Sequence, residues 1–196
     1  MILDNIKNEE DEKMKNILII NGHEAYPHAR GQLNHTIFTA MADKLGEKYD
    51  IKKTVVADGY DIPEEHEKFK WADVVIYQTP IYWFSLPALF KKYIDEIYEY
   101  GLFYKGTEDY GRGGLFTDKQ YMFSTTWNAP QEVFSKEGTF FEGKSLDEAL
   151  FHLHKMQEFV GMKPLKTFSV HDVISHPNID QYLKDLDAHL KEVFAI

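Results

Sequence analysis

The stretch that decides the fold is Trp71-Ala-Asp-Val-Val-Ile-Tyr-Gln-Thr-Pro80, which continues as Ile81-Tyr-Trp-Phe-Ser-Leu-Pro87. Residues 74–76 form a β-branched run with no alternation of polarity. Such a run is typical of a parallel strand that helices cover on both faces. We therefore expect a central strand of a parallel sheet here.

A helix is expected directly after this strand. Apolar side chains recur at helical spacing over residues 89–98, Ser85 is the expected N-cap, and Pro87 falls in the first turn, where its missing N–H costs nothing. Tyr82 and Trp83 lie between strand and helix, at the carboxyl end of the strand, where open α/β sheets bind ligands. An aromatic turn suits a flat ligand, although such turns also close cores or form subunit interfaces.

The composition is that of one packed domain. The 196 residues include 43% hydrophobic and 15% aromatic side chains, carry a formal net charge of -10 and contain no cysteine. The lack of cysteine removes disulfides and thiolate metal sites and fits a reducing compartment, and the acidic charge argues against nonspecific binding to nucleic acid. No apolar run approaches a membrane span, and the first residues lack the apolar core of a secretory signal. We expect a cytoplasmic protein with a charged tail over residues 1–15 and one domain over residues 16–196.

Strand and helix patterns alternate along the chain. Strands are expected at residues 16–20, 51–56, 74–76, 120–124 and 165–170, and helices at residues 31–46, 61–70, 85–98, 145–160 and 179–194, with an irregular excursion at residues 101–117 and a loop at residues 125–144. Ser145 and Glu148 form a capping box at the start of the fourth long helix. The alternation predicts a flavodoxin-like, doubly wound α/β fold with five parallel strands in the order 2-1-3-4-5 and helices on both faces. Its cleft is expected at the switch point between strands one and three.

The loop after the first strand is a candidate anion site. The stretch His28-Ala-Arg-Gly-Gln-Leu-Asn-His-Thr36 opens a helix, and Gly31 permits close backbone approach. Free N–H groups of the first helical turn would bind an anion, together with the side chains of Arg30, Gln32, Asn34 and Thr36. This pattern favours phosphate. An ordinary capped helix is the alternative, since the stretch matches neither GxGxxG nor a Walker loop.

The loop after the fourth strand begins Thr125-Thr-Trp-Asn-Ala-Pro130. Its backbone N–H groups and the Asn128 amide are placed to meet the polar edge of a flavin, and a capped turn is the alternative. The nine histidines do not predict a metal site, because no HExxH motif is present and His152 and His154 diverge on a helix. We expect no metal.

Together these segments resemble the modulator of drug activity B family, which comprises NAD(P)H:quinone oxidoreductases of the flavodoxin-like group. The segments that carry the resemblance are Ile17-Leu-Ile-Ile-Asn-Gly22, Gly31-Gln-Leu-Asn34, Trp71-Ala-Asp-Val-Val-Ile76, Lys91-Lys-Tyr-Ile-Asp95 and Thr126-Trp-Asn-Ala-Pro130. Residues 80–87 are also similar to the corresponding turn of the mammalian-type quinone reductases. The resemblance covers the chain from Asn16 to its end.

The resemblance implies a homodimer with FAD, FMN being the less favoured flavin, and NADPH as hydride donor. It implies two-electron, ping-pong reduction of a quinone. The expected cofactor-binding residues are His28, Ala29, Arg30, Gly31, Gln32, Leu33, Asn34, Thr36, Pro80, Ile81, Tyr82, Trp83, Phe84, Tyr110, Thr126, Trp127, Asn128 and Ala129. No catalytic acid or base is assigned. Two alternatives remain: reduction of azo or nitro compounds with the same flavin, and a non-enzymatic, flavin-bearing electron carrier or regulatory subunit.

Overall fold

The computed structural model describes residues 15–196, so the expected charged tail falls outside the described residues except for Lys15. The sheet consists of β1 (Asn16–Asn21), β2 (Asp50–Val55), β3 (Val74–Pro80), β4 (Gln120–Thr126), β5 (Lys163–Pro164) and β6 (Phe168–Val170). Every pairing is parallel, and the order is β2-β1-β3-β4-β5 with β6 also on β4. The predicted order is confirmed.

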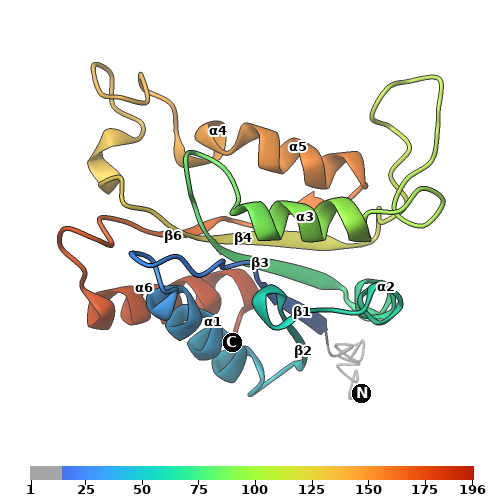
Figure 1. Cartoon of the computed structure of the whole chain (residues 1–196), viewed down its shortest axis with the longest axis horizontal. Coiled ribbons are helices and arrows are strands. Elements are labelled where there is room, and N and C mark those ends of the chain that lie inside the picture. The colour runs from blue at the N-terminus through green and yellow to red at the C-terminus, as the bar shows by residue number, and fades with distance from the viewer. Residues whose placement is uncertain (1–14) are drawn as a thin grey trace, which may run out of the picture.

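Helices cover both faces of this sheet. They are α1 (Gln32–Leu45), α2 (Ile62–Trp71), α3 (Ala88–Ile97), α4 (Leu146–Ala149), α5 (Phe151–Phe159) and α6 (Ile179–Phe194), with short 3-10 turns at Val56–Asp58 and Gln131–Val133. Figure 1 shows α1 and α6 on one side of the sheet and α3, α4 and α5 on the other. No helix among residues 15–196 combines the length and apolarity that crossing a membrane requires.

The central strands feed two separate cores. On β1, Ile17 and Ile19 pack with α1 and α6, whereas Leu18 and Ile20 pack with α3 and α5. All four side chains are fully buried. This explains why the strand reads as a continuous apolar run, because neither of its faces meets water.

Three local expectations are wrong. Ser85 does not cap α3, whose N-cap is Pro87, because both backbone polar groups of Ser85 bond to Tyr82. The strand expected at residues 165–170 is observed only as β6 over residues 168–170, because β5 lies before it at residues 163–164 and residues 165–167 belong to neither strand. The helix expected at residues 145–160 is interrupted at Leu150, although its capping box is present.

The excursion between α3 and β4 contains no helix or strand, as expected, and is held by isolated bridges of Tyr104 to Tyr100 and Gly114. Because it leads into the start of β4, it lies at the amino ends of the strands. In Figure 1 it projects at the far right, whereas the strands end on the left. The two edges of the sheet therefore carry different loops.

Candidate functional site

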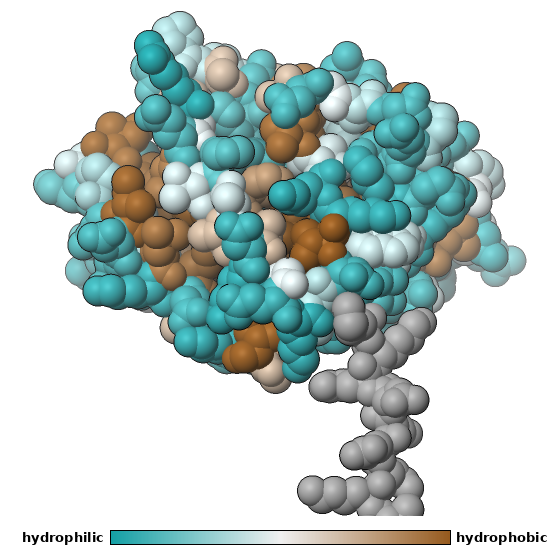
Figure 2. All heavy atoms as spheres, turned by 90° about the horizontal axis from the view of Figure 1, so that it is seen from below, coloured by the Kyte–Doolittle hydropathy of each residue, from teal (hydrophilic) through white to brown (hydrophobic). Residues whose placement is uncertain are grey.

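The carboxyl ends of the strands border a cleft of about 850 Å³. Its walls come from the β1–α1 loop, the β3–α3 turn and the loop after β4. The predicted residues that line it are His28, Ala29, Ile81, Tyr82, Trp83, Phe84, Trp127, Asn128 and Ala129. From below, the surface is mostly hydrophilic, and its broadest apolar group lies on the side where the strands end (Figure 2). The structure thus brings three separately predicted loops to one place.

The β3–α3 turn is tight and strained. The backbone N–H of Tyr82 donates to the Ser85 carbonyl (2.9 Å), and the N–H of Ser85 donates to the Tyr82 carbonyl (3.1 Å). Trp83 and Phe84 between them have φ of 49° and 64°, the left-handed values of a type I′ turn, which normally holds Asn and Gly. Trp83 is 93% exposed. Bulky residues in this region cost about 1–3 kcal/mol each, and such strain concentrates at ligand sites.

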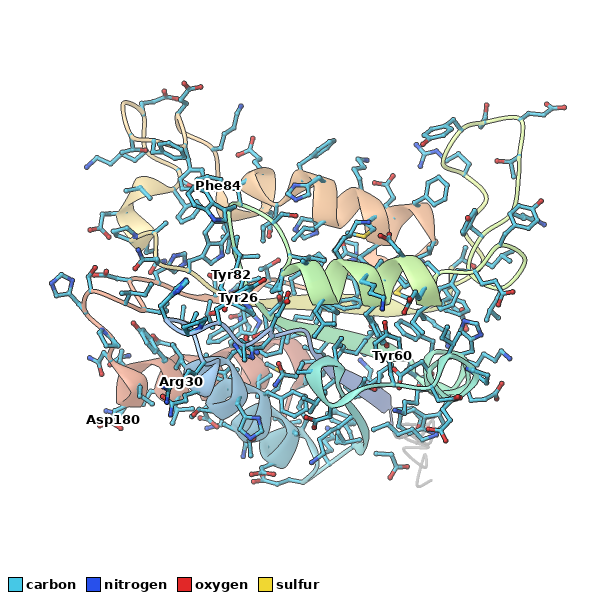
Figure 3. All side chains as sticks on the ribbon, viewed as in Figure 1. Tyr26, Arg30, Tyr60, Tyr82, Phe84 and Asp180 are labelled. Carbon is cyan, nitrogen blue, oxygen red and sulfur yellow. The ribbon has the colours of Figure 1, made fainter. Side chains whose placement is uncertain are left out.

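The β1–α1 loop forms the wall opposite this turn. Tyr26 and Ala29 exchange backbone hydrogen bonds of 3.0 Å, and the Tyr26 ring meets Tyr82 edge-on with centroids 5.5 Å apart. Figure 3 shows the two tyrosines side by side. Burial raises the pKa of Tyr82, with smaller contributions from Tyr26 and Glu24. Glu24 also accepts the N–H of Leu89 in the first turn of α3 (2.9 Å), so it connects the two loops.

The loop after β4 adds an aromatic cover. Phe140 stacks on Phe84 with centroids 5.5 Å apart and planes 17° from parallel, and Phe141 stacks on Phe134 at 4.3 Å. Phe140 is 74% exposed. Tyr26, Phe140 and Phe141 could not be predicted as site residues, since they lie in polar loops outside any motif. A cluster of aromatic residues within a loop was the only available signal.

The amino end of α1 is open for an anion. Its N-cap, Gly31, has no side chain to occupy the first-turn N–H groups, and the first turn contains no acidic residue. Gly31 has φ of 75°, and a Cβ there would fall 2.1 Å from the His23 ring. Arg30 is exposed and has no ion pair or hydrogen bond with any residue of the described chain. A helix terminus with free N–H groups beside a free guanidinium suits phosphate.

Not every residue of the predicted anion site faces this opening. Asn34 is 2% exposed, its Nδ2 donates to Asn21 Oδ1 (2.8 Å), and its Oδ1 accepts from Gln78 Nε2 (2.7 Å). Thr36 Oγ1 donates to the Gln32 carbonyl (2.9 Å). Leu33 packs against the core beneath α1. The donors at the opening are therefore backbone N–H groups, Arg30 and Gln32.

The loop after β4 offers fewer free donors than expected. The N–H of Trp127 donates to Val170 (2.9 Å), and its indole Nε1 donates to Thr125 Oγ1 (3.0 Å). Thr126 and Pro80 are buried at the ends of their strands. The N–H groups of Asn128 and Ala129 and the Asn128 amide have no partner in residues 15–196. They are the groups that remain to meet a ligand.

His171 supports this loop from behind. Its Nδ1 lies 3.1 Å from the carbonyl oxygen of Ala129, and its ring meets Phe134 edge-on at 5.3 Å. Burial lowers the pKa of His171, an effect that the Ala129 carbonyl opposes. A neutral ring donates from Nδ1 to this carbonyl, which fixes the backbone that carries the free N–H of Ala129.

Tyr110 is the predicted residue that the structure separates from the others. It is 93% exposed, and its ring contacts Phe159 of α5 at 5.9 Å. It belongs to the excursion at the amino edge of the sheet, opposite the cleft (Figure 1). Tyr110 therefore does not contribute to the cleft of its own chain.

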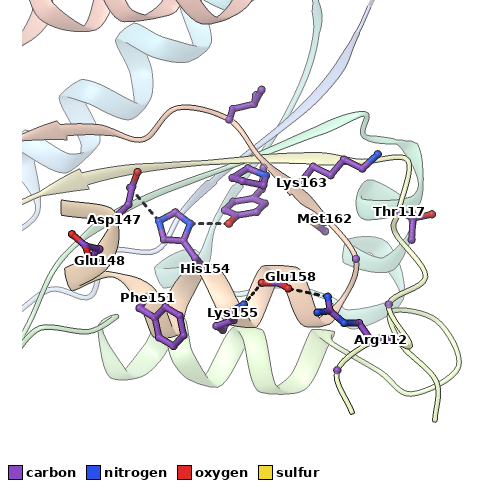
Figure 4. Close-up of a pocket in the computed structure, with 16 residues that line it drawn as sticks. Arg112, Thr117, Asp147, Glu148, Phe151, His154, Lys155, Glu158, Met162 and Lys163 are labelled. Carbon is purple, nitrogen blue, oxygen red and sulfur yellow. Dashed lines mark hydrogen bonds and ion pairs between the residues drawn. The ribbon is translucent and has the colours of Figure 1, made fainter. Parts of the chain in front are cut away.

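A second hollow, of about 670 Å³, lies beside α5 at the amino-terminal half of β4 (Figure 4). There Tyr121 bonds to His154 Nδ1 (2.7 Å), and His154 Nε2 lies 3.2 Å from Asp147. The carboxylate can only accept, so Nε2 donates to Asp147. Tyr121, His154 and Asp147 therefore already have one another as hydrogen-bond partners, and burial raises the pKa of Tyr121. They hold α5 to the sheet.

In the part of the chain that the structure describes, no three histidine, aspartate or glutamate residues are grouped to hold a metal.

The fold and cleft agree with comparisons to known proteins. A family model described as flavodoxin-like fold matches residues 15–190. The NADPH:quinone oxidoreductase MdaB of Haemophilus influenzae is 44% identical over 190 residues, which cover 91% of this chain and 99% of that protein. The chain belongs to the modulator of drug activity B family of flavodoxin-like proteins. This membership confirms the predicted family and the prediction of an oxidoreductase.

One curated protein and one solved structure extend the comparison. An FMN-dependent NADH:quinone oxidoreductase of a Marinomonas species is 28% identical over 142 residues, covering 72% of this chain and 62% of that protein. The structure of general stress protein 14 from Treponema denticola, in complex with FMN, matches with a TM-score of 0.68 and 19% identity over 92% of this chain and 98% of that one. The latter likeness shows the shared fold alone.

Proposed function

We propose that this protein is a flavin-dependent NADPH:quinone oxidoreductase. The observation that supports it best is the cleft itself, where exposed aromatic rings, free backbone N–H groups and an uncapped helix terminus come from three loops at the carboxyl edge of the sheet. Flat, partly apolar ligands fit such a cleft. The likeness to a protein named NADPH:quinone oxidoreductase supports the choice of donor and acceptor.

The residues present fit a flavin at both of its ends. The phosphate would lie at the amino end of α1 beside Arg30 and Gln32, where N–H groups are free and no acid opposes it. The ring would lie in the cleft against Tyr82 and Trp83, with the N–H of Asn128 or Ala129 toward its polar edge. When bound, the flavin accepts and donates the hydride; the protein orients it and tunes it.

The chain contributes orientation, exclusion of water and hydrogen-bond donors. The Phe84–Phe140 stack and Phe141 cover the cleft, which lowers the local polarity and strengthens any hydrogen bond from the loop after β4. His171 holds the Ala129 carbonyl, so the neighbouring N–H stays directed. No side-chain acid or base is assigned to the hydride transfer.

Nicotinamide and quinone are expected to use one slot in turn. Aromatic side chains from all three loops line the cleft, and we expect a flat ring bound between them to exclude a second. Initial rates with NADPH and a quinone should give parallel double-reciprocal lines, with competitive inhibition by excess quinone against NADPH. Intersecting lines would exclude a ping-pong mechanism, and a flavin-loaded protein that oxidises NADPH without reducing quinones would exclude quinone reductase activity.

The resemblance implies FAD, and we propose FAD as the flavin. Two of the matched proteins carry FMN in their names, so the identity has to be measured. Acid release of the bound cofactor followed by chromatography should give FAD. Recovery of FMN would correct the cofactor while leaving the proposed reaction intact.

We further propose a cytoplasmic homodimer in which Tyr110 reaches the partner's cleft. Tyr110 on the excursion is 93% exposed, and Trp83 in the turn that borders the cleft is exposed to the same extent. Exposed aromatic residues of this kind are typical of subunit contacts. Sedimentation at micromolar concentration should give a dimer that Tyr110→Ala weakens. A fully active monomer would contradict this.

A further inference from the structure

A chain of buried side-chain amides runs across the sheet beneath the cleft. Ser124 on β4 donates to Gln78 Oε1 (2.5 Å), Gln78 Nε2 donates to Asn34 Oδ1 (2.7 Å), and Asn34 Nδ2 donates to Asn21 Oδ1 (2.8 Å). The N–H of His23 donates to the same Asn21 oxygen (3.1 Å). All four side chains of this relay, Asn21, Asn34, Gln78 and Ser124, are 3% exposed or less.

One backbone group fixes the direction of the whole relay. The N–H of His23 can only donate, so the Asn21 atom that it meets is the oxygen. Asn34 must then present its nitrogen to Asn21 and its oxygen to Gln78, and Gln78 must present its nitrogen to Asn34. The hydroxyl of Ser124 is left with the role of donor. No amide in the relay can turn over without opposing two like groups.

The relay ends on the loop that forms the candidate anion site. Beyond its N–H, His23 places its ring against Gly31, where a Cβ would meet it at 2.1 Å. Its Nε2 lies 3.2 Å from the carbonyl of Ala29. A continuous line of contacts thus leads from β4 through Gln78 and Asn34 to Gly31 and Ala29. These elements carry the loops on both sides of the cleft.

We propose that the relay Ser124–Gln78–Asn34–Asn21 consists of positioning residues that hold the β1–α1 loop in the conformation that binds the flavin phosphate. The inference rests on the proposed flavin function. An apolar core would bury these positions equally well, but apolar contacts have no direction and would leave the rotation of this loop relative to β4 unspecified. The amides specify it because only one arrangement satisfies every member.

Two substitutions at Gln78 separate positioning from packing. Gln78→Met keeps the shape and removes the donor. Gln78→Glu keeps the shape and restores a donor only when its carboxyl is protonated, because the protonated oxygen can donate to Asn34 while the other accepts from Ser124. Desolvation favours the protonated form of a buried carboxyl. Three histidines lie on the elements around this face, namely His23, His35 on α1 and His189 on α6, and none of their rings bonds to the relay. The charged side chains of these two helices do not bond to the relay either; they are Asp43 and Lys44 on α1, and Asp180, Lys184, Asp185, Asp187, Lys191 and Glu192 on α6.

The measurement is the dissociation constant of the flavin from the apoprotein, followed by fluorescence from about pH 8 to about pH 5. Gln78→Met should weaken binding roughly tenfold or more at every pH, the size of effect that loss of supporting hydrogen bonds has on bound metals. Gln78→Glu should bind weakly at high pH and approach the wild-type affinity as the pH falls. A purely structural role would lower the thermal stability of the apoprotein without this recovery.

Two further variants complete the experiment. Tyr77→Phe removes a buried hydroxyl from the neighbouring position of β3, on its other face, and should leave the flavin affinity unchanged. Ser124→Ala removes only the hydroxyl that donates to Gln78. If a Gln78 variant fails to fold, Ser124→Ala still measures the effect of the relay on flavin affinity. Wild-type flavin affinity in Ser124→Ala and in every folded Gln78 variant, at all pH values, would refute the positioning role of the relay and leave the proposed function standing. A wild-type chain that binds no flavin would overturn the proposed function as well.

Discussion

At the scale of single residues, the glycine at the start of α1 is required by its neighbour as well as by its backbone angle. Gly31→Ala would place a Cβ 2.1 Å from the His23 ring at φ of 75°. We expect a loss of about 1–3 kcal/mol in unfolding free energy from the backbone alone, with the clash added to it. Urea unfolding measures the loss. The double variant with His23→Ala should recover the part due to the clash, and strictly additive losses would contradict that contact.

Arg30 and Gln32 test the anion site without disturbing the fold. Both are exposed, and neither side chain bonds to the described chain. A hydrogen bond to a charged group contributes about 1.5–3 kcal/mol, so Arg30→Ala and Gln32→Ala should each weaken flavin binding by roughly one to two orders of magnitude. Fluorescence titration with unchanged thermal stability is the expected pattern. Lys184→Ala on α6 serves as a charge-matched control.

At the scale of elements, the turn at residues 82–85 combines strain with exposure. A type I′ turn favours Asn-Gly, so replacing Trp83 and Phe84 by Asn and Gly should relieve about 1 kcal/mol or more of strain, partly offset by the lost Phe84–Phe140 contact. The same change should raise the KM for quinone. Thermal unfolding and steady-state kinetics measure the two effects. A variant less stable than the wild type would contradict the strain, and an unchanged KM would contradict a contact between this turn and the quinone.

Element boundaries show what sequence patterns can and cannot predict. The strand order and the long helices could be predicted from periodicity, because burial on one face or on both faces determines the spacing of apolar residues along the sequence. The break between β5 and β6 was not predicted, because the polar pair Lys166 and Thr167 lies between apolar Leu165 and Phe168 and was included in one expected strand. The true N-cap of α3 was hidden as well, because the bond partners of Ser85 depend on the turn closing on Tyr82.

The candidate site shows the same division. Helix-terminus donors and the aromatic turn could be predicted because they adjoin strands and helices with clear patterns. The role of Asn34 could not be predicted from the sequence. A polar residue in the first turn of a helix is expected to be exposed and to donate to a ligand, whereas Asn34 is buried against Asn21 and Gln78. Phe140 reaches the cleft only through the path of a long loop, which no local pattern specifies.

For the whole molecule, stability is expected to fall with moderate acid. Burial lowers the pKa values of His171 and His189 below the ordinary value of about 6.5. Between the folded and unfolded pKa values the unfolded chain binds more protons, so this contribution is complete above about pH 6.5 and is lost as the pH falls through the folded values. Denaturant unfolding at several pH values measures the slope. His189→Gln should flatten it and the exposed His35→Gln should not; equal slopes in all three proteins would contradict this origin.

The separation of Tyr110 from its own cleft has a genetic consequence. In the proposed dimer each catalytic unit takes its phosphate loop from one chain and its Tyr110 from the other. A chain carrying Arg30→Ala and a chain carrying Tyr110→Ala would each be defective alone. Their mixed dimer would combine both lesions in one unit and leave the other unit wild type. Two defective alleles, one of each kind, expressed in the same cell should therefore complement each other, whereas two alleles altered in the phosphate loop should not.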